Sequence, residues 1–210
     1  MSIHSTEPKI FCIGRNKTGT TSLKYVLKQH GYKVGNQRKS ELLIDHYANR
    51  NFKRIAKFCE KATVYQDVPF SLPYLYIYLD NVFPNAKFIL SVRNSPIEWY
   101  ESLVRFHKTV FDCDGDLPTK QDLLDADYVQ KGYAWKVNRI LYKSPEDDLY
   151  NKQQLIRSYR IHNDQVKDYF RHKNNLLVLR LSKLDSYDRL CSFLDIEKKF
   201  GQMPHLNKSQ

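Results

Sequence analysis

The chain has 210 residues, 41% of them hydrophobic and 13% aromatic, so it is long and apolar enough to fold as one domain with a sizeable core. It carries 34 Lys and Arg against 23 Asp and Glu, a formal charge of +11, which favours anionic partners such as nucleotides, acidic glycans, nucleic acid or membrane surfaces. No apolar run approaches the length of about 18 residues that a membrane span needs, and the polar residues 1–9 lack the apolar core of a signal peptide.

The cysteines are far apart in the chain, and no two of them form a C-x-x-C pair. They are Cys12, Cys59, Cys113 and Cys191. This spacing suggests neither a zinc site nor a disulfide framework, so we expect reduced, buried thiols. Together with the polar N-terminus, it predicts a cytoplasmic protein without a membrane span.

Residues 10–27 predict a strand, a turn and a helix in direct succession. Residues 10–13 form a continuous apolar run, which is typical of a strand buried on both faces of a parallel sheet. After the turn, the apolar residues Leu23, Val26 and Leu27 fall at helical spacing. The helix is therefore expected to begin near Thr20 and to stop at Gly31.

The turn itself, residues 14–22, has the sequence GRNKTGTTS. Its backbone N–H groups would point at a bound anion beside the positive end of the helix dipole, and phosphate is the natural guest. Gly14 and Gly19 have the spacing of the P-loop pattern G-x-x-x-x-G-K-[ST], but Thr20 stands where the lysine belongs. The cation lies inside the loop instead, at Lys17, which weakens the case for ATP or GTP as the ligand.

The segment from Lys17 to Thr21 resembles the K-[ST]-G-T-[TS] loop of the sulfotransferases that use 3′-phosphoadenosine-5′-phosphosulfate (PAPS). In that family the loop binds the 5′-phosphosulfate, and its lysine contacts the oxygen that bridges phosphate and sulfate. The resemblance gives Lys17 this catalytic role. The donor-binding residues that it implies in the loop are Arg15, Asn16, Lys17, Thr18, Gly19, Thr20 and Thr21.

A second strand and a carboxylate follow the first helix. Residues 40–49 and 51–61 predict two short helices, the second capped by Asn51. Residues 63–66 predict a strand, and Asp67 comes directly after it. In open parallel sheets ligands bind at the carboxyl ends of the strands, so we expect Asp67 on the same side as the phosphate loop.

Asp67 is the first candidate for the base that takes the proton of the acceptor's hydroxyl or amine group. The D-x-P segment that begins there resembles the base position of the smaller sulfotransferases. Two other readings stay open, in which Asp67 caps the next helix or pairs with a surface lysine. His107 is the reserve candidate for the base.

The third predicted strand is followed by a strong sequence signal for the start of a helix. Residues 71–83 predict a helix with Pro73 in its first turn, and residues 87–92 predict a buried strand. Ser95 and Glu98 then form an S-x-x-E capping box with Pro96 at the first helical position.

Arg93 projects from the end of the third strand, and Ser102 lies inside the following helix. This pair resembles the arginine and serine with which sulfotransferases hold the 3′-phosphate of the nucleotide, so Arg93 and Ser102 are donor-binding candidates. The serine usually comes eight residues after the arginine, whereas here it comes nine after it. Ser95 or the helix terminus could therefore supply the hydrogen bond instead.

The last part of the chain predicts a long helix over residues 150–172, a strand over 176–181 and a helix over 186–194. Asp112, Asp114 and Asp116 are spaced like calcium ligands. The turn glycine and the closing glutamate of a calcium loop are missing, so no metal is predicted. The tail resembles the P-H-x-N segment of some small sulfotransferases, where Lys208 would approach a phosphate unless the end is frayed.

Alternating strands and helices predict an α/β fold, a single three-layer domain over residues 1–210 with a central parallel sheet of four or five strands, like P-loop kinases. The resemblance implies a sulfotransferase that needs PAPS and no metal, with a nucleotide donor and an unidentified acceptor as partners and nucleic acid disfavoured. A small-molecule kinase, or a basic nucleotide- or glycan-binding protein, remains the alternative.

Overall fold

The computed structural model describes residues 8–111 and 116–206. The chain divides into two compact units, one formed by residues 1–93 and 165–210 and the other by residues 94–164. The first unit contains β1 (Ile10–Cys12), α1 (Thr20–Gln29), α2 (Gln37–Glu41), α3 (Ile44–Ala48), α4 (Phe52–Phe58), η1 (Cys59–Lys61), β2 (Val64–Gln66), α5 (Leu75–Val82), β3 (Lys87–Ser91), β4 (Leu176–Leu179) and α10 (Ser186–Leu194). The second contains α6 (Pro96–Val110), α7 (Lys120–Asp125) and α8 (Tyr133–Leu141), and α9 (Lys152–Phe170) begins in it and ends in the first. That residues 1–210 act as a single domain stays a prediction.

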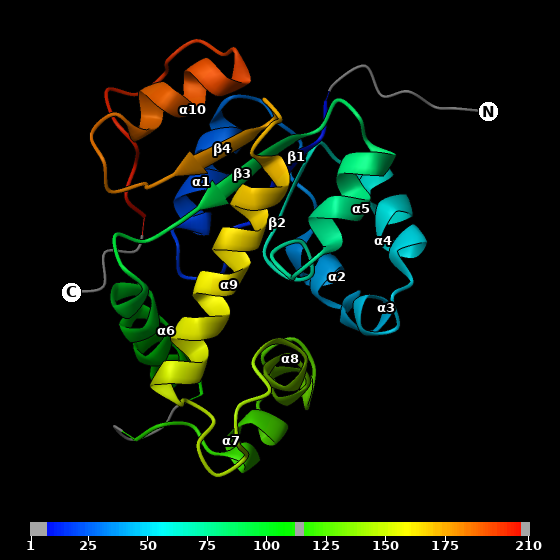
Figure 1. The fold of residues 1–210 in the computed structure, drawn as a ribbon, viewed down its shortest axis with the longest axis vertical. Helices are drawn as coiled ribbons and strands as arrows, with labels where there is room; N and C mark the ends of the chain where they lie inside the picture. Colours follow the sequence, from blue (N-terminus) through cyan, green and yellow to red (C-terminus); the bar gives the residue numbers. More distant parts are fainter. Residues whose placement is uncertain (1–7, 112–115, 207–210) are drawn as a thin grey trace. The chain divides into compact units, whose positions relative to one another are not determined.

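The strands of the first unit form one parallel sheet in the order β2-β1-β3-β4 (Figure 1). The central strand β1 pairs with β2 and β3, so that Cys12 lies opposite both Gln66 and Ile89. The carboxyl ends of β1, β2 and β3 consequently meet at one edge of the sheet. The predicted α/β fold with a parallel sheet is confirmed, and the sheet has four strands.

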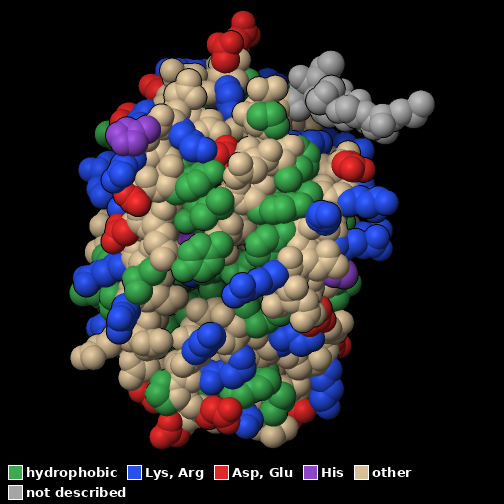
Figure 2. All heavy atoms as spheres, turned by 45° about the vertical axis from the view of Figure 1, so that its right-hand side comes forward, with side chains coloured by type: hydrophobic (Ala, Val, Ile, Leu, Met, Phe, Trp, Pro, Cys, Tyr) green, Lys and Arg blue, Asp and Glu red, His purple; other side chains and the backbone are tan. Residues whose placement is uncertain are grey.

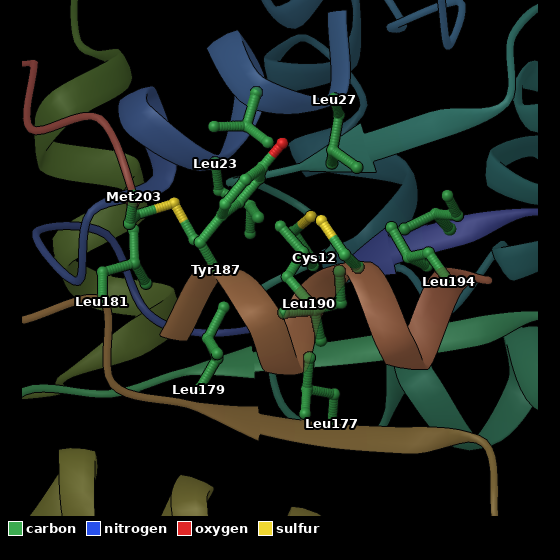
Figure 3. Close-up of a cluster of buried hydrophobic side chains, with 14 of the residues drawn as sticks. Cys12, Leu23, Leu27, Leu177, Leu179, Leu181, Tyr187, Leu190, Leu194 and Met203 are labelled. Carbon is green, nitrogen blue, oxygen red and sulfur yellow. The ribbon is translucent and has the colours of Figure 1, made fainter. Parts of the chain in front are cut away.

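Alternate residues of β1 point into two cores on opposite faces of the sheet, which gives the unit its three layers. Ile10 and Cys12 pack with α1 and α10 in the core drawn in Figure 3, where Tyr187 and Met203 also point inward. Phe11 belongs to the opposite core, which α4, α5 and the end of α9 cover. Complete burial of β1 explains why its sequence is apolar without interruption.

The predicted helix over residues 71–83 is wrong at its start, because α5 begins only at Leu75. Pro73 disfavours helical backbone in the residue before it, and Tyr74 adopts a left-handed φ of 63°. The segment before α5 forms turns instead, in which the Ser71 N–H donates to the Asp67 carbonyl oxygen at 2.8 Å.

The predicted helix over residues 40–49 is also wrong, because the structure has two shorter helices, α2 and α3, with Leu42 and Leu43 between them. Asn36 caps α2 by accepting a hydrogen bond from the Lys39 N–H at 3.0 Å. The side chain of Asn51 makes no capping bond to α4, contrary to the prediction.

Helix α6 begins as predicted, with Pro96 in its first turn and the Ser95 hydroxyl accepting from the Glu98 N–H at 3.0 Å. The core of the second unit centres on Trp99, whose ring stacks on that of Tyr159 with 4.6 Å between centroids. Helix α7 begins with a capping box, in which Thr119 and Asp122 cap reciprocally.

The basic residues are distributed over the surface. Figure 2 displays one face of the molecule, on which Lys and Arg side chains lie among exposed hydrophobic side chains. On α4, for example, Lys53, Arg54 and Lys57 are all exposed. Within the described residues, no helix combines the length and the apolar character needed to cross a membrane.

A carboxylate at the edge of the first unit joins α5 to the segment after α9. Asp80 is only 8% exposed, and it accepts hydrogen bonds from Tyr169 at 2.9 Å, Lys173 at 2.5 Å and Asn175 at 2.8 Å. Burial alone would raise the pKa of Asp80, but these hydrogen bonds outweigh it and hold the pKa below its ordinary value of 3.8. The ionised form is therefore stabilised by folding.

We predict that Asp80→Asn lowers the free energy of unfolding by about 1.5–3 kcal/mol at neutral pH, the usual range for hydrogen bonds to a charged group. A depressed folded-state pKa stabilises the fold above the unfolded-state pKa and ceases to do so as the pH falls through the folded-state value. Urea unfolding from pH 7 down to pH values below about 4 should therefore show the difference shrinking.

Asp168→Asn is the matched control, because Asp168 forms only an exposed pair with Arg171 and should cost no more than about 0.5 kcal/mol. Equal effects of the two substitutions would contradict a structural role for Asp80.

Candidate active site

The loop after β1 packs directly against the end of β3. A Cβ atom on Gly14 would collide with the Oγ, O and N atoms of Ser91, so only glycine permits this approach. The Oγ1 of Thr18 lies 2.6 Å from the Oγ of Ser91 and also donates to the Arg15 carbonyl at 2.6 Å. Ser91 is completely buried and holds the loop at both Gly14 and Thr18.

Two arginines also fix the loop. Arg15 is 1% exposed, and its Nη1 donates to the Ser71 carbonyl at 3.2 Å, which joins the loop to the segment after Asp67. Arg93 follows β3, and its Nε donates to the Lys17 carbonyl at 2.5 Å. Lys17 itself adopts a left-handed φ of 65° and is half-buried at the top of the turn.

Helix α1 begins at this loop with an open N-terminus. Its N-cap residue is Gly19, with φ of 93°, and no side chain caps the helix. The first turn of α1 contains no acidic residue. Among the described residues, the N–H groups of Thr20 and Thr21 donate to no backbone carbonyl. Unsatisfied N–H groups at the positive end of a helix dipole, with Lys17 beside them, make a site for an anion.

The carboxylate of Asp67 lies beside the first turn of α1. Its Oδ2 accepts from the Gln66 Nε2 at 2.9 Å, and the Thr20 hydroxyl also hydrogen-bonds to the carboxylate. The other oxygen, Oδ1, is buried and has no hydrogen-bond partner among the residues that the structure describes. Since α5 begins eight residues after Asp67, at Leu75, the side chain does not cap that helix.

Burial raises the pKa of Asp67 above its ordinary value of 3.8. Hydrogen bonds from Thr20 and Gln66 and the positive charges of Lys24 and Lys17 oppose this shift without cancelling it. A carboxylate with a raised pKa takes up a proton more readily than an exposed one, and the surrounding donors and cations favour its ionised form. The site therefore pairs an anion-binding loop with a group that can accept a proton.

The remaining predicted residues belong to the second unit or lie outside the described residues. Ser102 is buried in α6, and His107 on the same helix hydrogen-bonds through Nδ1 to the Tyr150 hydroxyl at 2.8 Å. Both belong to the second unit, so the structure does not relate them to Arg93 or Asp67. Ser95 is engaged as the N-cap of α6. Lys208 lies outside the described residues.

Sequence reasoning missed three residues of this site, namely Gln66, Ser91 and Lys24. Gln66 and Ser91 are polar residues at the ends of otherwise apolar strands, a signal that could have identified them. Lys24 carries no such signal, because a lysine on a helix is ordinarily an exposed residue. Within the described part of the chain, no group of three or more His, Cys, Asp or Glu residues could hold a metal ion.

A parallel sheet with an anion-binding loop at the end of its central strand defines a class of α/β proteins that bind phosphate groups. Within that class the chain belongs to the sulfotransferase domain family, whose model matches residues 9–210. It is therefore a sulfotransferase, an enzyme with a sulfuryl donor and an acceptor, and enzymes of this family typically use PAPS.

The fold is also similar to that of a sulfotransferase from Alicyclobacillus acidocaldarius known from a crystal structure. The match has a TM-score of 0.55 and 16% sequence identity, and it covers 97% of this chain and 87% of the other. At this identity the likeness concerns the fold alone. A search of curated protein sequences found no significant match.

Proposed function

We propose that this sulfotransferase transfers the sulfuryl group of PAPS to a hydroxyl or amine acceptor, with the 5′-phosphosulfate bound at the N-terminus of α1. The uncapped helix beside Lys17 is the observation that carries the proposal. Anions are stabilised at such a terminus by the helix dipole and by its unpaired N–H groups. PAPS supplies the sulfuryl group and a nucleotide leaving group, and every other part of the reaction is assigned to residues of the chain.

We assign Lys17 the role of stabilising the negative charge that develops on the oxygen between phosphate and sulfate. Its left-handed backbone is held by the Arg93 bond to its carbonyl, so the part of the loop that carries this side chain is fixed. The donor-binding set is completed by the loop N–H groups, including that of Gly19, and by the side chains of Arg15, Asn16, Thr20 and Thr21. The hydroxyl of Thr18 is already engaged with Ser91, so this residue is assigned to the anion through its backbone.

Asp67 is assigned as the general base. Its Oδ1 is buried without a partner among the described residues, and an acceptor's hydroxyl or amine proton is the donor that this oxygen lacks. The raised pKa of Asp67 improves proton uptake.

Arg93 and Ser102 are assigned to bind the 3′-phosphate of the donor, with Lys208 near this phosphate. A cytoplasmic location remains part of the proposal.

The experiment that tests the proposal is transfer or hydrolysis of PAPS by Lys17→Ala. We expect the rate to fall about a hundredfold to a thousandfold, as when one preorganised electrostatic contact is removed. The fold should be unchanged, since Ala retains the backbone carbonyl of residue 17 that accepts from Arg93. Lys33→Ala, which removes an exposed lysine, is the control. Turnover of Lys17→Ala within a few-fold of Lys33→Ala would assign the chemistry elsewhere.

A second prediction concerns Arg93. Adenosine 3′,5′-bisphosphate should raise the melting temperature more than AMP, which lacks the 3′-phosphate. A ligand at a hundredfold excess over its Kd adds about 2.7 kcal/mol. Arg93→Ala should remove the difference between the nucleotides while retaining the AMP shift, which reports an intact loop. Loss of both shifts together would mean that Arg93 only supports the loop through Lys17.

The third prediction tests the base. Asp67→Asn should leave the affinity for adenosine 3′,5′-bisphosphate nearly unchanged and lower transfer by about two to four orders of magnitude. Hydrolysis of PAPS, with water in place of the acceptor, provides the assay. The acid limb of its pH profile should disappear in the variant. If Asp67→Asn keeps both the rate and the limb, the assignment of the base is refuted, and His107→Ala becomes the next variant to measure.

A further inference from the structure

We propose that Lys24 is a positioning residue that keeps the buried carboxylate of Asp67 charged and ready to accept a proton. The inference rests on the proposed role of Asp67 as the base. It adds a residue from the second turn of α1 that the phosphate loop does not contain.

The position of Lys24 follows from helix geometry. Residues four apart lie on the same face of an α-helix, so Lys24 is one turn beyond Thr20, whose hydroxyl bonds to the Asp67 carboxylate. The ammonium group of Lys24 makes no ion pair with Asp67 in the described residues, and it acts on the carboxylate through space. Across a buried, poorly solvated region such a charge is screened far less than at the surface.

A hydrogen-bonded chain holds Lys24 in this place. Its Nζ donates to the Gln37 Oε1 at 3.2 Å, and the Gln37 Nε2 donates to the Glu41 Oε1 at 3.1 Å. Glu41 is 5% exposed and also accepts from the Arg38 Nη1 at 3.3 Å. The amide of Gln37 is thus fixed in orientation, with its oxygen toward the lysine. This arrangement limits the freedom of a side chain that is usually mobile.

The charges around Asp67 explain why Lys24 is needed. Lys17 in the loop is a second cation whose charge acts on the carboxylate, and it is the one assigned to the donor. Glu41 on α2 is a nearby anion, and burial together with the charge of Asp67 contributes to the raised pKa of Glu41. Cys12 on β1 is buried as a thiol. When the anionic donor engages Lys17, Lys24 remains as a cation that offsets the burial of Asp67.

The test measures the titration of Asp67 directly. Carboxyl ¹³C NMR spectra of aspartate-labelled protein are recorded against pH for the wild type, Lys24→Met, Lys24→Arg and Lys28→Met, with Asp67→Asn to assign the signal. Lys28 is an exposed lysine on the same helix and serves as the matched control. Lys24→Met should raise the midpoint for Asp67, whereas Lys24→Arg and Lys28→Met should leave it close to that of the wild type.

The pH profile of PAPS hydrolysis gives the second readout. In Lys24→Met the acid limb should move to higher pH, and on the limb the rate should fall by about tenfold for each pH unit of displacement. Identical midpoints and limbs in Lys24→Met and Lys28→Met would overturn the inference. Because Asp67→Asn tests the base independently, a limb that persists in that variant would instead mean that the proposed function of Asp67 is wrong.

Discussion

The close approach of Gly14 to Ser91 is the constraint on which the site depends. It brings the end of β1 against the end of β3, and the Thr18 hydroxyl completes the contact on the other side of the loop. With the loop held in this way, α1 begins at a glycine without a capping side chain. A helix that leaves its first N–H groups unsatisfied loses stability, which is recovered when an anion binds there. The start of α1 is thus suited to an anion.

The same edge of the sheet carries a buried negative charge that needs compensation. Asp67 directly follows β2, and burial of an unpaired carboxylate is expensive unless cations and hydrogen-bond donors surround it. Thr20, Gln66, Lys17 and Lys24 supply these partners from the loop, from β2 and from α1. The groups that we assign to the donor and the groups that set the proton affinity of Asp67 therefore overlap at Lys17 and Thr20. A substitution that alters the binding of the donor should therefore also change the proton affinity of Asp67, because both depend on the same charges.

The sequence predicted those features that depend on neighbouring residues. The apolar run of β1, the glycine-rich turn and the Ser95 cap of α6 all follow from local patterns, and each lies where it was expected. The start of α5 did not follow, because Pro73 and the left-handed Tyr74 override an apolar pattern of helical spacing. Gln37 and Glu41 are four residues apart on α2, but Lys24 meets Gln37 only through the tertiary placement of α1 beside α2, which no local pattern reports.

The central claim is that the anion site at α1 is built for a nucleotide with a 3′-phosphate and a 5′-phosphosulfate. Calorimetric titration of the wild-type protein with adenosine 3′,5′-bisphosphate, and separately with ATP and magnesium, tests it most directly. The account predicts saturable binding of the bisphosphate and weak or no binding of ATP, because Thr20 stands where a P-loop has its lysine. Tighter binding of ATP with magnesium would contradict it, and so would the absence of binding by either nucleotide.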